Sequence, residues 1–207
     1  MKIGIIGAHI VGMRLATEFE RAGHDILMTN SGGLDSVREK LARQGGKAKI
    51  TPATMSEVLD CELVVLAAPW IKREEVLDPA YDWKGRILLD ATNTYLSYPP
   101  NYRADDLKGD SGSEIIARLA PSARVVKAFN TLDFGVMFSP PPAGVQRVLF
   151  AAGDDEEALK TVCGLIKAIG FRPVALGTLA AGGRLMELEA PLHLLELFAP
   201  LEQEASA

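Results

Sequence analysis

Lys2-Ile3-Gly4-Ile5-Ile6-Gly7-Ala8-His9-Ile10-Val11-Gly12 opens the chain and decides its fold. The apolar run 2–6 predicts a strand, and the apolar spacing of residues 13–22 predicts an amphipathic helix after the glycine turn. Strand, glycine turn and helix form the unit that binds the diphosphate of a dinucleotide. Gly7 would permit the tight turn, Gly12 would let helix and strand pack closely, and the helix N-terminus would offer N–H groups to the phosphates.

The turn departs from the G-x-G-x-x-G pattern at its middle position, where His9 stands. That position normally has no side chain, so that the backbone can approach the diphosphate. The imidazole must therefore point away, or it shifts the phosphates and donates a hydrogen bond to them. The alternative is an ordinary strand-to-helix turn of an α/β protein without a nucleotide, and the hexapeptide alone does not choose between the two.

Composition limits the classes of function. The 207 residues fit one domain, and the net charge of −5, from 22 basic and 27 acidic residues without a basic stripe, argues against a nucleic-acid partner. No apolar run approaches the ~18 residues of a membrane span, and the chain begins directly on a strand, so we expect neither a membrane partner nor a signal peptide. Cys61 and Cys163 have the surroundings of small core residues. A cytoplasmic protein without a metal site is expected.

Short apolar runs alternate with helical patterns almost throughout the chain. This order predicts an α/β fold: one doubly wound Rossmann-type domain over residues 1–207, with a mostly parallel sheet covered on both faces. The helix over 154–169 has Asp154 as its expected N-cap and Gly170 as its stop. The apolar segment 185–198 predicts a C-terminal helix, so that 184–207 would form a helix and tail suited to a dimer contact. The strands beyond the first are predicted at 25–29, 48–50, 62–67, 87–90, 124–128, 147–151 and 172–176.

Ligands of such sheets bind beyond the carboxyl ends of the strands, so the residues that follow each strand are the candidates for a site. Several of these residues are aromatic, and long loops commonly use aromatic side chains as anchors. Alternatively, some of them form an apolar wall for a flat ring such as nicotinamide or a flavin. The aromatic residues in these loops are Trp70, Tyr95, Tyr98, Tyr102, Phe129, Phe134 and Phe138.

The end of the second strand bears on the choice of cofactor. An NAD site usually places Asp or Glu there for the ribose 2′-hydroxyl, whereas this chain has Thr29-Asn30-Ser31 followed by two glycines. A 2′-phosphate would not be repelled, Ser31 could donate its hydroxyl, and Arg38 in the next helix could reach the phosphate. The pattern favours NADP, with NAD as the alternative.

Several short sequence blocks occur in a fixed order along nearly the whole chain, and their combination is more specific than any one of them. The blocks are residues 4–7 and 22–24, 29–31, 65–70, 90–93, 125–131, 152–155, and 177–179 and 183–187. On these blocks the chain resembles the family of NADPH-dependent oxidoreductases of coenzyme F420, a deazaflavin. The resemblance implies hydride transfer between the nicotinamide C4 and the C5 of a deazaflavin, a flavin or a similar small acceptor. It also implies a homodimer.

The resemblance further implies which residues bind the cofactor. Two positions depart from the family pattern: His9 replaces the middle glycine, and Gly32 stands where relatives have an arginine for the 2′-phosphate. The implied residues are Gly7, Ala8, His9, Ile10, Val11 and Gly12 for the diphosphate, Thr29, Asn30 and Ser31 for the 2′-phosphate, Ala67, Ala68, Pro69 and Trp70 for the central part, and Asn93, Phe129 and Asn130 nearer the nicotinamide.

Two other functions stay open at this point. An imine or small carbonyl reductase would need a proton donor near the nicotinamide, for which Lys127, Tyr95 and Asn130 are the candidates. A dinucleotide-binding module without catalysis would explain His9 and Gly32 as marks of lost activity. The sequence assigns no catalytic residue.

Overall fold

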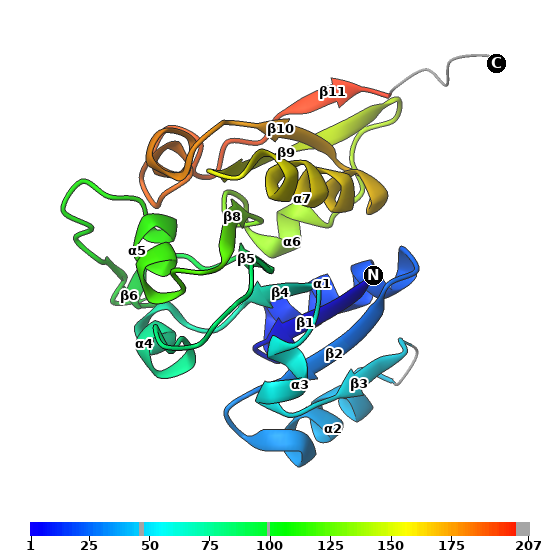
Figure 1. Cartoon of the computed structure of the whole chain (residues 1–207). Coiled ribbons are helices and arrows are strands. Elements are labelled where there is room, and N and C mark those ends of the chain that lie inside the picture. Colours follow the sequence, from blue (N-terminus) through cyan, green and yellow to red (C-terminus); the bar gives the residue numbers. More distant parts are fainter. Residues whose placement is uncertain (46–47, 99, 202–207) are drawn as a thin grey trace.

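The computed structural model describes residues 1–45, 48–98 and 100–201. Short strands alternate with helices from the N-terminus onward, as the sequence predicts (Figure 1). The strands are β1 Lys2–Ile6, β2 Asp25–Thr29, β3 Ile50–Pro52, β4 Leu63–Leu66, β5 Ile87–Asp90, β6 Tyr95–Ser97, β7 Arg103–Ala104, β8 Arg124–Ala128, β9 Val145–Gly153, β10 Arg172–Ala175 and β11 Phe198–Pro200. The helices are α1 Ile10–Arg21, α2 Gly33–Arg43, α3 Met55–Leu59, η1 Trp70–Lys72, α4 Arg73–Val76, α5 Gly112–Leu119, α6 Phe134–Met137, α7 Glu156–Ala168 and η2 Leu179–Gly183.

One large sheet carries the fold, in the order β10-β9-β8-β5-β4-β1-β2-β3. The pairs from β3 through β8 are parallel, whereas β9 runs antiparallel to β8. The expected doubly wound α/β fold with a mostly parallel sheet is confirmed. The chain leaves β1 toward β2 on one side and later returns to β4 on the other side. Because the order reverses between β1 and β4, their carboxyl ends open a crevice of the kind that binds ligands.

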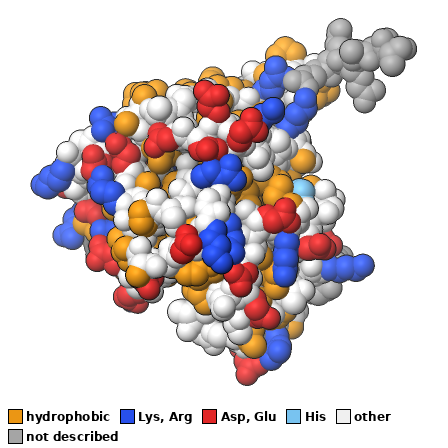
Figure 2. Space-filling model, in the orientation of Figure 1, with side chains coloured by type: hydrophobic (Ala, Val, Ile, Leu, Met, Phe, Trp, Pro, Cys, Tyr) orange, Lys and Arg blue, Asp and Glu red, His pale blue; other side chains and the backbone are white. Residues whose placement is uncertain are grey.

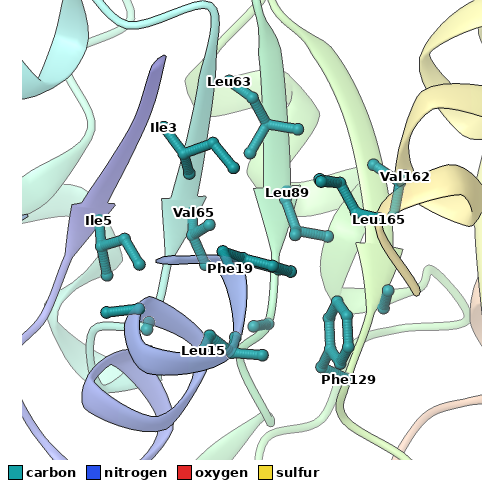
Figure 3. Close-up of a cluster of buried hydrophobic side chains, with 14 of the residues drawn as sticks. Ile3, Ile5, Leu15, Phe19, Leu63, Val65, Leu89, Phe129, Val162 and Leu165 are labelled. Atoms are coloured by element: carbon teal, nitrogen blue, oxygen red, sulfur yellow. The ribbon is translucent and has the colours of Figure 1, made fainter. Parts of the chain in front are cut away.

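Apolar side chains fill both faces of this sheet. Alternate residues of a strand point to opposite faces, so Ile5 and Val65 join the core under α1 and α7, while Ile6 and Val64 join the core under α3 and α5. Figure 3 shows the first of these cores, with Phe19 of α1 beside Phe129 beyond the end of β8. Burial on both faces explains why the strands read as continuous apolar runs.

On the face seen in Figure 2, acidic and basic side chains intermingle, and no large patch carries charge of one sign only. Within residues 1–45, 48–98 and 100–201, no helix has both the length and the apolar character that a bilayer crossing requires.

The predicted C-terminal helix over 185–198 is wrong. After the π-helical turn η2, the chain passes through successive turns and ends in β11, which pairs antiparallel with β9. Glu189 and Leu194 have φ of 65° and 60°, in the left-handed region, and Pro191 between them has no N–H to donate. These residues interrupt any regular helix although the composition is apolar. The predicted tail beyond residue 201 lies outside the described residues.

The helix α7 begins one residue later than its sequence pattern suggests. Asp155, not Asp154, is its N-cap and accepts the N–H of Ala158 at 2.8 Å. Asp154 instead accepts the N–H of Leu179 at 2.9 Å, and so ties the end of β9 to η2. The predicted stop is confirmed, since Gly170 follows the helix with φ of 93°.

Candidate functional site

The turn from β1 into α1 depends on two glycines. Gly7 has φ of 117°, and a Cβ placed there would lie 2.4 Å from the carbonyl oxygen of Ala67. A Cβ on Gly12 would lie 1.9 Å from the carbonyl oxygen of Gly7. Any side chain at either position would therefore separate the first turn of α1 from the ends of β1 and β4. The roles that the sequence predicts for both glycines agree with this geometry.

His9 is the N-cap residue of α1, with φ of −113° and ψ of −169°. This is extended backbone that any residue adopts, so the turn itself does not require glycine here. The side chain of His9 makes no capping hydrogen bond. The first N–H groups of α1 have no acceptor within the helix, and they carry the partial positive charge of the helix dipole. In the part of the chain that the structure describes, no side chain caps α1, so its first N–H groups can bind an anion.

A cavity of about 490 Å³ lies beyond the ends of β4, β5 and β8, against the start of α1. None of its lining residues is Asp, Glu, Lys or Arg. The lining residues are His9, Ile10, Val11, Ala67, Ala68, Pro69, Trp70, Ala91, Thr92, Asn93, Tyr95, Tyr98, Phe129 and Phe134. We call this space the ring cavity. Its walls can hold a flat apolar group, and its polar atoms belong to uncharged groups and one imidazole.

The loop aromatics divide between two roles. Trp70, Tyr95, Tyr98, Phe129 and Phe134 line the ring cavity, as the wall hypothesis predicts. Tyr102 and Phe138 are instead structural anchors. The hydroxyl of Tyr102 lies 3.3 Å from Glu189, and the ring of Phe138 packs edge-on against Phe171 beneath the guanidinium of Arg14.

Tyr95 is the more buried of the two tyrosines that line the ring cavity. It is half-buried between Tyr98 and Tyr102, with ring centroids at 5.1 and 5.4 Å. Burial, followed by the nearby Tyr98 and Asp133, raises the pKa of the Tyr95 hydroxyl above its usual value. The phenol therefore keeps its proton and can serve as a hydrogen-bond donor.

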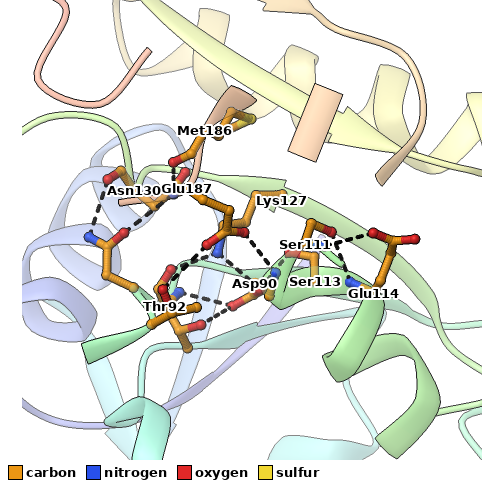
Figure 4. Close-up of polar contacts among 12 residues, drawn as sticks. Asp90, Thr92, Ser111, Ser113, Glu114, Lys127, Asn130, Met186 and Glu187 are labelled. Carbon is orange, nitrogen blue, oxygen red and sulfur yellow. Dashed lines mark hydrogen bonds and ion pairs between the residues drawn. The ribbon is translucent and has the colours of Figure 1, made fainter. Parts of the chain in front are cut away.

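The floor of the ring cavity rests on a buried polar network (Figure 4). The ammonium of Lys127 lies 3.2 Å from a carboxylate oxygen of Asp90, and neither side chain is exposed. Lys127 also donates to the carbonyl oxygen of Thr92 at 2.7 Å, while Asp90 accepts from the N–H and hydroxyl of Thr92. Ser113 donates to Asp90 at 2.6 Å. The network fixes the backbone that follows β5, where Thr92 and Asn93 line the cavity.

A second link joins this floor to the C-terminal segment. Asn93 donates to the carbonyl oxygen of Asn130 at 3.2 Å, and Asn130 donates to that of Met186 at 2.7 Å. The preceding residue, Phe129, has φ of 64° and is 1% exposed. A bulky residue in this region is strained, and the surrounding packing must hold it there. The strained turn directs the ring of Phe129 into the cavity wall and Asn130 toward Met186.

A second cavity of about 500 Å³ lies on the other side of His9, between the ends of β1 and β2 and the helices α2 and α4. We call it the polar cavity. It is lined by Ile6, Gly7, His9, Asn30, Ser31, Gly32, Ser36, Lys40, Met55, Ala68, Pro69, Lys72, Glu75 and Val76. His9, Ala68 and Pro69 border both cavities, so the two spaces meet above the N-terminus of α1.

Most of the residues that the sequence assigns to cofactor binding lie at one of these cavities. Five do not line either: Ala8, Gly12, Thr29, Arg38 and Asn130. Arg38 points elsewhere, with its guanidinium 2.7 Å from Asp35 on the exposed side of α2. The carbonyl oxygen of Thr29 accepts the N–H of Gly7 at 2.9 Å, which is a structural role.

Sequence reasoning missed the charged residues of the polar cavity. Lys40 lies on the second turn of α2, and Lys72 and Glu75 lie beyond β4, far from the motif in sequence. The only available signal was the spacing of Ser36 and Lys40, four residues apart and therefore on one face of a helix. Nothing in the sequence predicts that Lys72 faces the same space.

The arrangement of strand, glycine turn and helix is that of a Rossmann-type domain, the class of fold that binds dinucleotides. Residues 2–94 match the family described as NADP oxidoreductase, coenzyme F420-dependent. The match covers a little under half of the chain, and over these residues the chain is similar to that family.

Two solved structures and one curated protein are similar to this chain over most of its length. The hypothetical protein SMa0349 from Sinorhizobium meliloti is 35% identical, with 96% of each chain covered and a TM-score of 0.85. A proposed F420-dependent NADP-reductase from Arthrobacter sp. FB24 is 26% identical, with 86% of each chain covered and a TM-score of 0.66. Metalloreductase STEAP3 of Rattus norvegicus is 29% identical over 197 residues, which are 94% of this chain. The chain spans 37% of the length of that protein.

Proposed function

We propose that this chain binds NADP across the two cavities and transfers a hydride between the nicotinamide and a flat, uncharged ring of a deazaflavin, a flavin or a similar small acceptor. The observation that carries the proposal is the ring cavity: among the described residues, five aromatic side chains line it and no Asp, Glu, Lys or Arg side chain does. Hydride transfer to such a ring needs position and exclusion of water more than acid–base groups.

The residues present fit the cofactor. A side chain at Gly7 or Gly12 would fill the cradle at the start of α1, and both positions are glycine. The free N–H groups of that helix suit a diphosphate. The polar cavity would take the adenosine end, with NAD as the alternative to NADP, and the ring cavity would take the nicotinamide. Bound NADPH would supply the hydride, while Phe129, Trp70 and the tyrosines exclude water from the acceptor.

An imine or small carbonyl reductase is the second candidate, and Tyr95 favours it. Its phenol lines the ring cavity and keeps its proton, so it could protonate a reduced nitrogen or oxygen. The other donors considered from sequence are less suitable. Lys127 is fully buried under the cavity floor in its pair with Asp90, and Asn130 lies behind the wall.

One experiment separates these functions. Titration with NADPH and NADH, followed by fluorescence, should detect binding, and loss of NADPH absorbance should then follow addition of F420 or a flavin. Tyr95→Phe should leave the rate with these acceptors within about twofold. A cyclic imine as the only working acceptor, with a rate at least tenfold lower in Tyr95→Phe, would favour the second candidate, since acid–base groups contribute at least that much. A chain that binds neither nucleotide would contradict both. The homodimer implied by the resemblance stays a prediction.

The position of His9 between the cavities leads to a prediction about the diphosphate. Because the side chain borders both spaces and makes no capping bond, we expect it to donate a hydrogen bond to the bound diphosphate. His9→Gly should then weaken NADPH binding about threefold to tenfold, the usual effect of losing one such bond. Isothermal titration calorimetry measures this. Tighter binding by His9→Gly would mean that the imidazole obstructs the site.

A further inference from the structure

The polar cavity holds an unbalanced positive charge. Two lysines and one glutamate face it, and the ammonium of Lys72 lies 2.6 Å from the carboxylate of Glu75. Lys40 is half-buried at the same cavity. Among the residues that the structure describes, no carboxylate pairs with Lys40, whereas its neighbour Arg38 is paired with Asp35. Lys40 is therefore the cation of this cavity that remains available to an anionic ligand.

The turn before α2 leaves no room for a cation at residue 32. Asn30 accepts the N–H of Gly32 at 2.8 Å and donates to the hydroxyl of Ser36 at 3.1 Å. A Cβ on Gly32 would lie 2.7 Å from both the Cβ and the hydroxyl oxygen of Ser36. Real Cβ atoms do not approach so closely, so an arginine at this position would force the first turn of α2 to move.

Ser36 and Lys40 are four residues apart on α2, and both line the polar cavity. Residues at this spacing share one face of a helix. The hydroxyl of Ser36 accepts from Asn30, and its own hydrogen remains available to donate. A hydroxyl and an ammonium on one helix face form a pair of donors suited to a phosphate monoester, since charge-assisted hydrogen bonds are the stronger kind.

We infer that Lys40, with the hydroxyl of Ser36, holds the 2′-phosphate of NADP and is the residue that selects NADP over NAD. The inference rests on the proposed function, because it assigns the adenosine end of the same ligand to the polar cavity. The sequence offers Arg38, and the family pattern offers residue 32, as the source of the cation that holds the 2′-phosphate. The inference assigns this role to Lys40 on the second turn of α2 instead.

Small fragments of the cofactor test Lys40 directly. Isothermal titration calorimetry would measure binding of 2′,5′-ADP, which carries the 2′-phosphate, and of 5′-AMP, which lacks it. Lys40→Gln should weaken 2′,5′-ADP binding about tenfold, the effect of losing a charge-assisted hydrogen bond, and leave 5′-AMP binding within about twofold. The NADPH-to-NADH affinity ratio should fall by the same factor. Lys40→Arg should retain most of the preference.

Arg38→Gln is the matched control, because it removes a cation from the same helix outside the cavity. It should change neither affinity by more than about twofold, as expected for an exposed pair. The inference would be overturned if Lys40→Gln weakened the binding of both fragments equally or of neither. It would also be overturned if Arg38→Gln weakened the binding of 2′,5′-ADP as much as Lys40→Gln does. Wild-type chain that binds neither fragment nor NADPH would overturn the proposed function itself. Thermal unfolding of each variant shows that any loss comes from a folded chain.

Discussion

Lys127→Met is expected to lower the free energy of unfolding by about 3–5 kcal/mol, because it leaves the carboxylate of Asp90 buried without its cation. Both side chains have no exposed surface, and the ammonium also donates to the carbonyl oxygen of Thr92. The three remaining donors to Asp90, from Thr92 and Ser113, are uncharged. They cannot replace the lost positive charge in a site that water does not reach.

Urea unfolding followed by circular dichroism measures this effect. Lys160→Met is the matched control, since Lys160 is exposed on α7 and should change stability by no more than about 0.5 kcal/mol. The double variant Asp90→Asn/Lys127→Met should be more stable than Lys127→Met alone, because the unpaired charge is then absent. If Lys127→Met lowered the free energy of unfolding by less than about 1 kcal/mol, the buried carboxylate of Asp90 would not need the ammonium of Lys127, and this interpretation of the pair would be wrong.

The same pair positions the candidate site. Asp90 and Lys127 together fix both the N–H and the carbonyl oxygen of Thr92, and the next residue, Asn93, lines the ring cavity. Neither charged residue touches that cavity. Their burial under its floor explains why Lys127, which the sequence offers as a proton donor, is instead a positioning residue.

The fold could be predicted largely from short-range patterns. The apolar runs within β1 and β4 and the first three residues of β5 follow from burial on both faces of a parallel sheet, whereas β8 carries the buried Lys127. The failure at 185–198 has a physical cause. Of the apolar residues there, Met186 and Leu192 pack against β9, whereas Leu194, Leu195 and Leu197 are exposed. Left-handed turns at Glu189 and Leu194 interrupt the segment.

The parts of the candidate site that belong to one short sequence motif could be predicted from the sequence. The parts formed where distant segments of the chain meet were harder to predict. Gly7 and Gly12 belong to one turn, so their spacing alone indicates their roles. Lys40 enters the polar cavity because α2 has a particular rotation, which depends on the turn that Asn30 closes with Gly32. Arg38, two residues earlier on the same helix, points away for that reason. Such rotations are fixed by packing, and a single sequence does not reveal them.

Gly12→Ala is expected to weaken NADPH binding about 100-fold, because the start of α1 must move away from the turn. The added methyl would lie 1.9 Å from the carbonyl oxygen of Gly7 and 3.3 Å from a methyl of Ile5. These neighbours belong to the central strand β1 and the turn that follows it, so the start of α1 is the part that must move. Losing two charge-assisted hydrogen bonds to the diphosphate, at about 1.5 kcal/mol each, weakens binding by about two orders of magnitude. The overlap should also lower stability by about 1–3 kcal/mol.

Gly164→Ala on α7 separates this effect from the general consequence of replacing a helical glycine. A Cβ at Gly164 meets nothing within 4 Å, so the substitution should raise stability by up to about 1 kcal/mol and leave NADPH binding unchanged. Calorimetric titration and urea unfolding of both variants give the comparison. If Gly12→Ala bound NADPH as tightly as Gly164→Ala does, the diphosphate would not lie at the N-terminus of α1, and the proposed orientation of the cofactor would be wrong.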